Sequence, residues 1–237
     1  MRESTRNSKS QRNSKSPVLT AADRALARFW RVALGCEVCA TLAPNRKFPP
    51  PARGTARYGL MILGEAPGRV SLENRRPFSN PRNLTVRNAF ARAVAPRTLA
   101  PEALFYFSDA VKCWPASPTG ANRSPSSIET ATCVGRHLQK EIAIVRPRVI
   151  FAFGARAGVA ALGHPLRLAE VHGQTVANNA GIRVIPLMHP STINIAGMRR
   201  VGIRSLDQYE EELAVMFRRE IAPVLAGLDH PGEAAES

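Results

Sequence analysis

The sequence predicts an α/β fold, a single-domain αβα sandwich with a central four-stranded parallel sheet. Three observations lead to this prediction. The chain has 237 residues, enough for one domain that buries a core without disulfide bonds. Four short apolar runs have the length of buried strands and end in turn residues. Helical patterns separate these runs, an alternation typical of parallel sheets covered by helices.

The first helix is expected at residues 21–34, where apolar residues recur at helical spacing, and it ends just before Cys36. Residues 43–54 are rich in proline and arginine and are expected to form a loop. Strands are expected at 58–63, 104–111, 148–153 and 183–188, and further helices at 84–94, 128–145, 155–162 and 206–225.

Each expected strand is followed by a segment that carries turn or polar residues. These segments are residues 64–68, residues 112–115, Gly154 and residues 189–191. In an open parallel sheet, ligands bind outside the carboxyl ends of the strands. We therefore expect the four segments to meet in a single active cleft.

The charge of the chain indicates its partner. Lysine and arginine number 33 against 18 acidic residues, a formal charge of +15 that favours nucleic acid. A ribosomal or chromatin-like protein would carry a similar charge, but 44% hydrophobic and 22% charged residues are more typical of a globular enzyme. No run approaches the roughly 20 apolar residues of a membrane span, and no secretory signal pattern is seen. A soluble, cytoplasmic monomer is expected, with no membrane partner.

Both ends of the chain are expected to be loose. Residues 1–20 read as a disordered basic tail, residues 21–226 as the folded domain and residues 227–237 as a flexible tail. The basic tail would contact phosphates, only keep the protein in solution, or serve as an organelle transit peptide.

Four cysteines are candidate ligands of a metal site. Cys36 and Cys39 have the spacing at which two sulfurs on one turn reach the same ion, and Cys113 and Cys133 would complete the set. Structural zinc and an iron–sulfur cluster both fit. The second pair is separated by 19 residues, which fits the two knuckles of a zinc ribbon poorly and favours a cluster. Four buried free thiols are the alternative.

Five short motifs occur in a fixed order: GEAPG at 64–68, RPF at 76–78, VKCWP at 111–115, FAFGARA at 151–157 and HPS at 189–191. Together they resemble the uracil-DNA glycosylase superfamily, from about residue 34 to residue 199. The chain is most similar to the family-four branch, which carries a [4Fe-4S] cluster on four cysteines. The resemblance implies that Cys36, Cys39, Cys113 and Cys133 hold such a cluster, with structural zinc as the alternative.

The resemblance also implies roles for residues near an extruded base. Glu65, with Gly64 and Ala66 beside it, would lie near the flipped base and the attacking water. Phe78 would be the aromatic platform on which the base stacks. His189 would donate a hydrogen bond to uracil O2 as the leaving group gains negative charge.

Contacts to DNA are implied for a further set of residues. Ser191 would touch the backbone, and the loop 192–198 would enter the minor groove, where Ile193, Ile195 or Met198 would fill the gap left by the base. Phosphate contacts are expected from Arg199, Arg200 and His172. His137 and His164 are interpreted as surface residues, and Trp114 as a shield for the cluster.

Two positions depart from the family. Ala66 replaces the aspartate that activates water in the best-known members, and no lysine is placed as a Schiff-base nucleophile, so a monofunctional enzyme is expected. Asp109 replaces the asparagine that reads the uracil edge. An ionised carboxylate accepts from N3–H but offers no donor to O4.

Three functional explanations of Asp109 remain open. It is the missing general base, a protonated donor, or the reader of a different lesion. A purely structural role, capping a turn, is the fourth. A broad or shifted specificity, towards hypoxanthine, xanthine or modified cytosines, is predicted. The competing hypothesis is a nucleic-acid-binding protein that kept the fold but lost catalysis.

Overall fold

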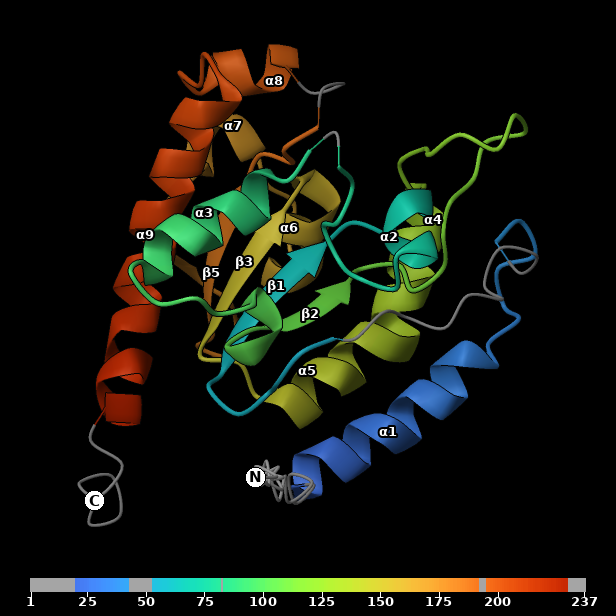
Figure 1. Cartoon of the computed structure of the whole chain (residues 1–237). Helices are drawn as coiled ribbons and strands as arrows, with labels where there is room; N and C mark the ends of the chain where they lie inside the picture. Colours follow the sequence, from blue (N-terminus) through green and yellow to red (C-terminus); the bar gives the residue numbers. More distant parts are fainter. Residues whose placement is uncertain (1–19, 43–52, 82, 192–194, 230–237) are drawn as a thin grey trace, which may run out of the picture.

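The computed structural model describes residues 20–42, 53–81, 83–191 and 195–229. Its sheet has the strand order β2-β1-β3-β5-β4. The strands are β1 (Leu60–Gly64), β2 (Tyr106–Asp109), β3 (Val149–Phe153), β4 (Val176–Ala177) and β5 (Arg183–Leu187). β2, β1, β3 and β5 are mutually parallel, as predicted, and their carboxyl ends point to the same edge (Figure 1).

The described sheet therefore has five strands, where four were predicted. The additional strand, β4, pairs antiparallel with β5 through two residue pairs. A strand of two residues, Val176–Ala177, is too short to produce an alternating pattern, which explains why the sequence did not reveal it.

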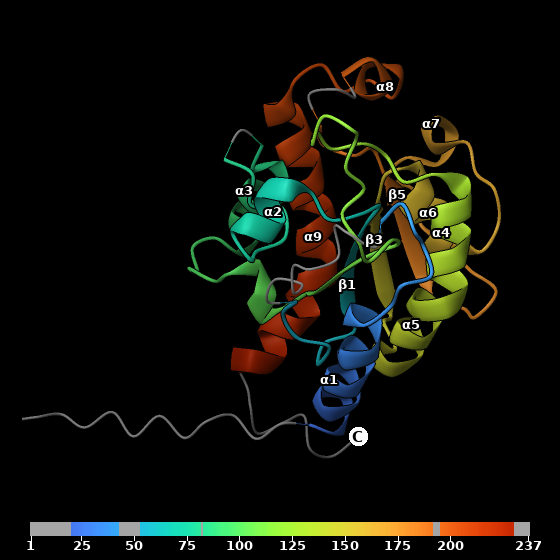
Figure 2. The ribbon, with the colours of Figure 1, turned by 90° about the vertical axis from the view of Figure 1, so that its right-hand side faces the viewer.

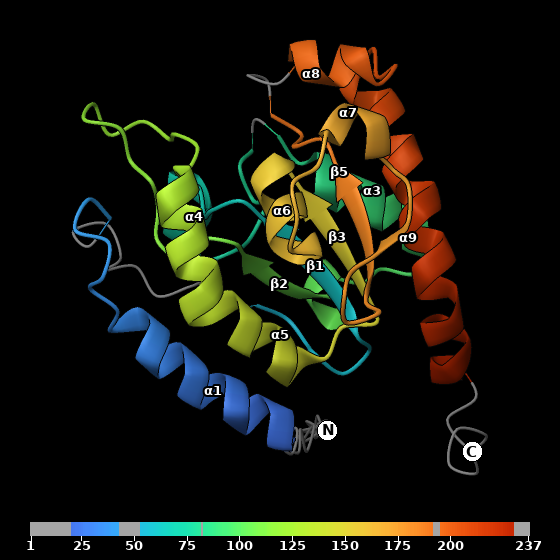
Figure 3. The same cartoon turned by 180° about the vertical axis from the view of Figure 1, so that it is seen from behind.

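Helices cover both faces of the sheet (Figures 2 and 3). The long α9 and α3 pack together on one face, and α1, α4, α5 and α6 lie on the other. The helices are α1 (Ala21–Leu34), α2 (Arg69–Glu73), α3 (Thr85–Val94), α4 (Ser127–Cys133), α5 (Gln139–Val145), α6 (Ala155–Leu162), α7 (Leu168–Val171), α8 (Ile195–Arg200) and α9 (Leu206–Asp229).

The core follows from the alternation of side chains along β1. Leu60 and Ile62 belong to the apolar cluster under α3 and α9, whereas Met61 and Leu63 belong to the cluster under α1, α5 and α6. Successive side chains of a strand point to opposite faces, so a strand covered on both sides is a continuous apolar run. This confirms the predicted sandwich.

The sequence places some helix ends well and misses one interruption. α1 begins after Thr20, whose side chain forms a capping box with Asp23. Its limits and those of α6 match the prediction. The single helix expected at 128–145 is instead α4, a π-helical segment at Val134–Leu138, and α5. Such π segments occur at functional sites, and this one follows Cys133 directly.

The predicted tails fall almost entirely outside the described residues, apart from Thr20 and the end of α9. α9 continues to Asp229, three residues past the predicted end of the domain at 226. None of the described helices combines the length and the hydropathy that crossing a bilayer requires.

Candidate active site and cysteine cavity

The first candidate group lies where β1 and β2 end side by side. Gly64 pairs in register with Asp109, and the amide of Ala110 donates to the Gly64 carbonyl at 2.8 Å. A Cβ atom on Gly64 would lie 2.5 Å from Oδ1 of Asp109. Position 64 therefore needs glycine because the Asp109 carboxylate approaches the backbone so closely.

Glu65 is anchored to the start of α6. Its Oε1 accepts from the backbone N–H of Arg156 at 3.1 Å. Gly154 precedes the helix with φ of 101°, and a Cβ there would overlap the Glu65 side chain. Burial raises the pKa of Glu65, against the opposing effects of the Arg156 N–H and charge. The carboxyl group is thus held at one oxygen by a helix N-terminus.

Phe78 and His189 meet at the same edge. Their ring centroids are 6.2 Å apart with planes inclined by 27°. The Phe78 ring also packs against the rings of Phe153 and Phe107, with centroid distances of 5.5 and 6.3 Å, and these contacts fix its orientation. Burial lowers the pKa of His189 to about 4, so the imidazole is neutral at neutral pH and carries one N–H.

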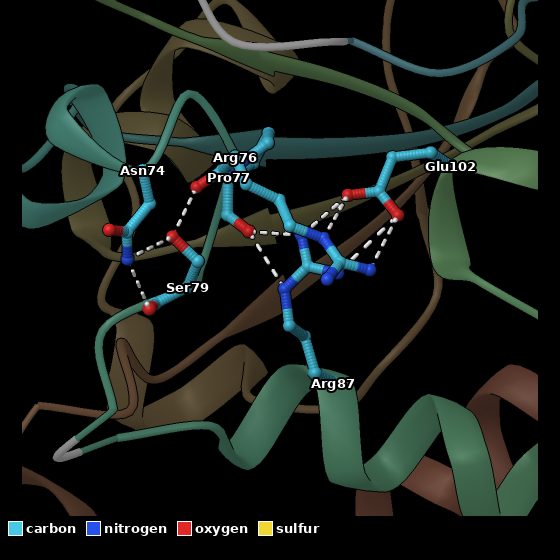
Figure 4. A network of polar contacts seen from close by, with 6 residues as sticks. All are labelled: Asn74, Arg76, Pro77, Ser79, Arg87 and Glu102. Carbon is cyan, nitrogen blue, oxygen red and sulfur yellow. Dashed lines mark hydrogen bonds and ion pairs between the residues drawn. The ribbon is translucent and has the colours of Figure 1, made fainter.

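The loop that carries Phe78 is held by a polar network (Figure 4). Arg87 donates to the Pro77 carbonyl through Nε at 3.0 Å and pairs with Glu102 at 2.6 Å. Arg76 reaches the same Glu102 at 3.2 Å. Burial would raise the pKa of Glu102, but the hydrogen bonds from the two arginines outweigh it and lower that pKa. Phe78 has φ of 50°, and this network holds the loop in which that conformation occurs.

Sequence analysis missed Arg87 and Glu102. The signal that identifies them is visible only in the fold: Arg87 donates to the carbonyl of Pro77, 10 residues away in the chain, and Glu102 pairs with Arg87.

Asp109 lies above a network of buried charges. Nη1 of Arg53 is 3.8 Å from its Oδ2. Lys112 Nζ pairs with Glu141 at 2.6 Å and donates to Ser108 Oγ at 2.8 Å and to the Asp109 carbonyl. Burial raises the pKa of Asp109, while Arg53 and Lys112 oppose that shift. For Glu141 the opposing effect of Lys112 and Arg53 exceeds that of burial, and its pKa is lowered.

The residues predicted to contact DNA differ in their exposure in the structure. Arg199 and Arg200 are exposed on α8. The amide of Ser191 donates to the His189 carbonyl at 2.8 Å, which keeps these two residues of the HPS motif together. Met198 is buried in the core, at 4% exposure, so it does not project from the surface as a wedge. Ile193 lies outside the described residues.

His172 lies behind the His189 segment. Its Nδ1 accepts from the Met188 amide at 3.1 Å, and its ring packs 5.7 Å from that of Tyr209. Burial lowers the pKa of His172, and its Nε2 is buried without a hydrogen-bond partner. In this arrangement the imidazole supports the residues next to His189.

The second candidate group is a cavity lined by Cys36, Cys39, Cys113 and Cys133. It lies between the end of α1 and the junction of α4 with the π-helical segment, and none of these four described cysteines forms a disulfide bond. The amide of Lys112 donates to Cys133 Sγ at 3.3 Å. Burial is the main cause that raises the pKa of the Cys39 and Cys133 thiols, and neighbouring cysteines add to it.

The cysteines share the cavity but do not converge on one point. Among the described residues, no three cysteine, histidine, aspartate or glutamate side chains form a ready-made site for one metal ion.

Of the interpretations of residues near the cavity, the one for His137 was wrong and the one for Trp114 gains no support. His137 was placed on the surface, but it is 4% exposed, lines the cavity, and has a buried Nε2 without a partner. The helical pattern could not reveal this because the π-helical segment turns its side chains to a different face. Trp114 donates to Asn122 at 2.8 Å and is not part of the cavity lining. His164 is exposed, as expected.

Comparison with known proteins settles the family. Residues 51–213, well over half of the chain, match the family model of the uracil DNA glycosylase superfamily. The chain belongs to this superfamily. It is 28% identical over 199 residues to a type-4 uracil-DNA glycosylase of Pyrobaculum aerophilum, covering 81% of this chain and 93% of the relative. The type-4 enzyme of Thermotoga maritima is 29% identical over 157 residues, covering 66% and 76%.

A type-5 uracil-DNA glycosylase of Pyrobaculum aerophilum is 33% identical over 157 residues, covering 62% of this chain and 59% of the relative. The superfamily predicted from the five motifs is thus confirmed, and so is its family-four character.

Proposed function

We propose that this protein is a monofunctional uracil-DNA glycosylase-type enzyme, which extrudes a damaged base from DNA and hydrolyses its N-glycosidic bond. The observation that carries the proposal is the pair of rings at the carboxyl edge of the sheet, Phe78 and His189, beside the close pairing of Gly64 with Asp109. The printed names of its type-4 and type-5 relatives support the same activity.

The chemistry follows from the side chains. The extruded base stacks on Phe78, and the backbone of residues 64–66 lies along it. The bond from the base to C1′ breaks with its electron pair going to the base, and the N–H of neutral His189 stabilises the negative charge that develops on the base oxygen. A water adds to C1′, and the proton that it loses neutralises the departing base anion. Glu65 orients this water, and the products are a free base and an abasic site.

We further propose that Asp109 gives the enzyme a broad or shifted specificity. Its carboxylate lies beside Gly64, where it would meet the edge of a base stacked on Phe78. A carboxylate accepts from N–H groups, so hypoxanthine, xanthine and modified cytosines are candidate substrates besides uracil.

We propose that the four cysteines hold a [4Fe-4S] cluster, with structural zinc as the alternative. Each iron of such a cluster takes its own cysteine, so the sulfurs must surround a volume instead of one point. The four cysteines line one cavity, which supports this proposal, whereas a zinc ion would need all four sulfurs within bonding distance of one point. Bound there, the group would tie the loop after α1 to the turn after β2 and to α4.

DNA is the proposed partner, single- or double-stranded. Arg199 and Arg200 would bind phosphates, Ser191 would contact the DNA backbone, and Ile193 would enter the minor groove. The formal charge of +15 supports a polyanionic partner. The domain predicted at residues 21–226, which α9 extends to Asp229, is proposed to act as one monomeric catalytic domain.

The test uses end-labelled oligonucleotides, single- and double-stranded, each with one uracil, hypoxanthine, xanthine or modified cytosine. Strand breaks are scored with and without alkali. Breaks only after alkali are expected, since a monofunctional enzyme leaves an intact abasic strand. If the protein binds the DNA but releases no base from any substrate, it is the catalytically inactive binding protein instead.

A further inference from the structure

We propose that Arg53 is the positioning residue that holds Asp109 as a hydrogen-bond acceptor towards the base, and so sets which bases are released. The inference rests on the proposed function, because it concerns the same base-binding site. Arg53 lies in none of the five motifs; its role follows from its place in the fold.

The Arg53 guanidinium is fixed from several sides. Nη1 donates to the Phe107 carbonyl at 3.1 Å, and the planar group lies 3.8 Å from the centroid of the Trp30 ring. Trp30 is itself held, since its Nε1 donates to the Tyr106 hydroxyl at 3.0 Å. The Arg53 side chain is only 8% exposed, and its Nε is buried without a partner. A positive charge kept this dry acts strongly on a carboxylate 3.8 Å away.

Four charged groups share this buried region: Arg53 from the segment before β1, Asp109 at the end of β2, Lys112 from the following turn and Glu141 from α5. Lys112 and Glu141 form the tightest pair, at 2.6 Å with exposures of 3% and 0%. Glu141 also accepts from the Tyr106 and Ser108 hydroxyls, at 2.7 and 2.6 Å. Lys112 is therefore largely neutralised by Glu141, which leaves Arg53 as the counter-charge of Asp109.

The consequence for recognition is direct. Burial raises the pKa of Asp109, and the Arg53 charge 3.8 Å away opposes that shift. Arg53 therefore favours the ionised form of Asp109, which only accepts hydrogen bonds and suits bases that present N–H groups at their edge. Without Arg53, the region would hold one cation and two carboxylates, which favours the protonated form of Asp109. A protonated Asp109 also donates, as an asparagine amide does, and thereby gains a partner for uracil O4.

The decisive variants are Arg53→Met, Arg53→Lys, Asp109→Asn and the double variant Arg53→Met/Asp109→Asn. Arg31→Met is the matched control, because Arg31 is exposed on α1 and the substitution removes the same guanidinium group and charge. Single-turnover release from the four damaged bases is measured from pH 5 to pH 9, and thermal unfolding is followed for each variant.

Arg53→Met is expected to move the acidic limb of the pH profile upward by about one pH unit or more. At pH 7 it should raise the rate for uracil relative to the modified cytosine, which carries an amino group, by about tenfold, since a pKa rise of one unit increases the protonated fraction of a mostly ionised carboxyl about tenfold. Asp109→Asn should remove this acidic limb and give the same order of release rates among the bases as Arg53→Met. The double variant should match Asp109→Asn, because Arg53 acts through Asp109. Arg53→Lys should restore the wild-type order in part.

The proposal is overturned if Arg53→Met slows all bases equally with an unchanged pH profile, for then Arg53 only supports the fold. A second measurement does not depend on activity. The Asp109 carboxyl is followed by carbon-13 NMR titration in the wild type and in Arg53→Met, or in Arg53→Gln if that variant does not fold. An upward shift of its titration is expected, and no shift refutes the inference.

These outcomes separate the two proposals. A wild-type protein that releases no base refutes the proposed function, while the NMR titration still decides whether Arg53 controls Asp109.

Discussion

The rings of Phe78 and His189 face each other at the carboxyl edge of the sheet, with planes inclined by 27°. One ring comes from the loop after α2 and the other from the turn after β5, so only the parallel sheet brings them together. A planar ring stacked on Phe78 lies within reach of the His189 imidazole. The platform and the hydrogen-bond donor of the proposed reaction are thus parts of one arrangement.

Replacing Phe78 by alanine should slow base release by about 10- to 100-fold, because stacking of a base on an aromatic ring contributes about 1–3 kcal/mol. Phe78→Tyr keeps the ring and should retain most of the rate. The measurement is single-turnover release under saturating enzyme. Phe90→Leu is the control: Phe90 is fully buried under α9, so this change should lower thermal stability but not the rate. Equal losses of rate in both variants would contradict the role of Phe78.

His189→Ala should lower the rate of base release by about 100-fold, the loss typical of removing one donor to a developing oxyanion. Burial lowers the pKa of His189 to about 4, so the wild-type rate should not depend on titration of His189 near pH 6.5. The pH profiles of the wild type and His189→Asn should therefore have the same shape near pH 6.5. A histidine limb near pH 6.5 that disappears in His189→Asn would show that His189 acts as imidazolium.

The same shift predicts how stability depends on pH. The folded-state pKa of His189 lies below its unfolded value of 6.5, so between about pH 4 and pH 6.5 the unfolded state binds more protons. Stability contributed by neutral His189 is therefore complete above pH 6.5 and falls as the pH drops towards 4. The free energy of unfolding in urea should differ less between pH 5 and pH 7 for His189→Asn than for the wild type. His172 has the same direction of shift and remains in both proteins.

The main strands, the first helix and the site residues that follow strand ends could be predicted from the sequence, because buried parallel strands and helical faces leave periodic apolar patterns. β4 and the π-helical segment after Cys133 could not, since each is too short to leave a period of its own. Met198 shows another limit: a methionine between Gly197 and two arginines gives no sign of whether its side chain turns inward.

Partners contributed by distant segments were also beyond the sequence. Nothing near Asp109 in the chain indicates that Arg53 is its counter-charge, or that Arg87 holds the carbonyl next to Phe78. Asp109 itself could be recognised as unusual from its position, but the meaning of its charge depends on Lys112, Glu141 and Arg53 together.

Gly64→Ala should reduce base release by at least about tenfold while the protein still folds. The new Cβ would lie 2.5 Å from Oδ1 of Asp109, closer than van der Waals contact permits, so the carboxylate must move. Asp109→Ala removes the obstructing atom. Combining it with Gly64→Ala should therefore cost less than the sum of the two single changes, in a double-mutant cycle. Strict additivity would show that Gly64 and Asp109 do not interact.

Glu129 links α4 to the segment that follows Cys39. It caps the helix with Ser126, pairs with Arg123 at 2.6 Å and accepts from Thr41 at 3.0 Å. The hydrogen bond from Arg123 is the main cause that lowers the pKa of Glu129 to about 2, against burial. Because this pKa lies below the unfolded value, the stabilisation is complete above about pH 4.5 and is lost as the pH falls towards 2.

Glu129→Gln should cost about 1–3 kcal/mol of unfolding free energy at pH 7, as expected for hydrogen bonds to a charged group. The difference from the wild type should shrink at low pH, which urea unfolding at pH 7 and pH 3 would measure. Glu170→Gln is the control, since Glu170 pairs with Arg167 on the surface and should contribute little. A loss at pH 3 as large as that at pH 7 would contradict the role assigned to the charge of Glu129.

Removal of one cysteine tests the metal centre independently of catalysis. Cys113→Ser should leave a protein with less iron, weaker visible absorption and lower thermal stability than the wild type, because the four thiols line one cavity between α1, the turn after β2 and α4. Chelation of the wild-type protein should lower its melting temperature in the same way, and Thr132→Ser, a change at the cavity wall that keeps all four sulfurs, should not. A colourless wild-type protein with one zinc per chain would exclude the cluster, and identical melting temperatures with and without metal would show that the cysteines stabilise the fold as thiols alone.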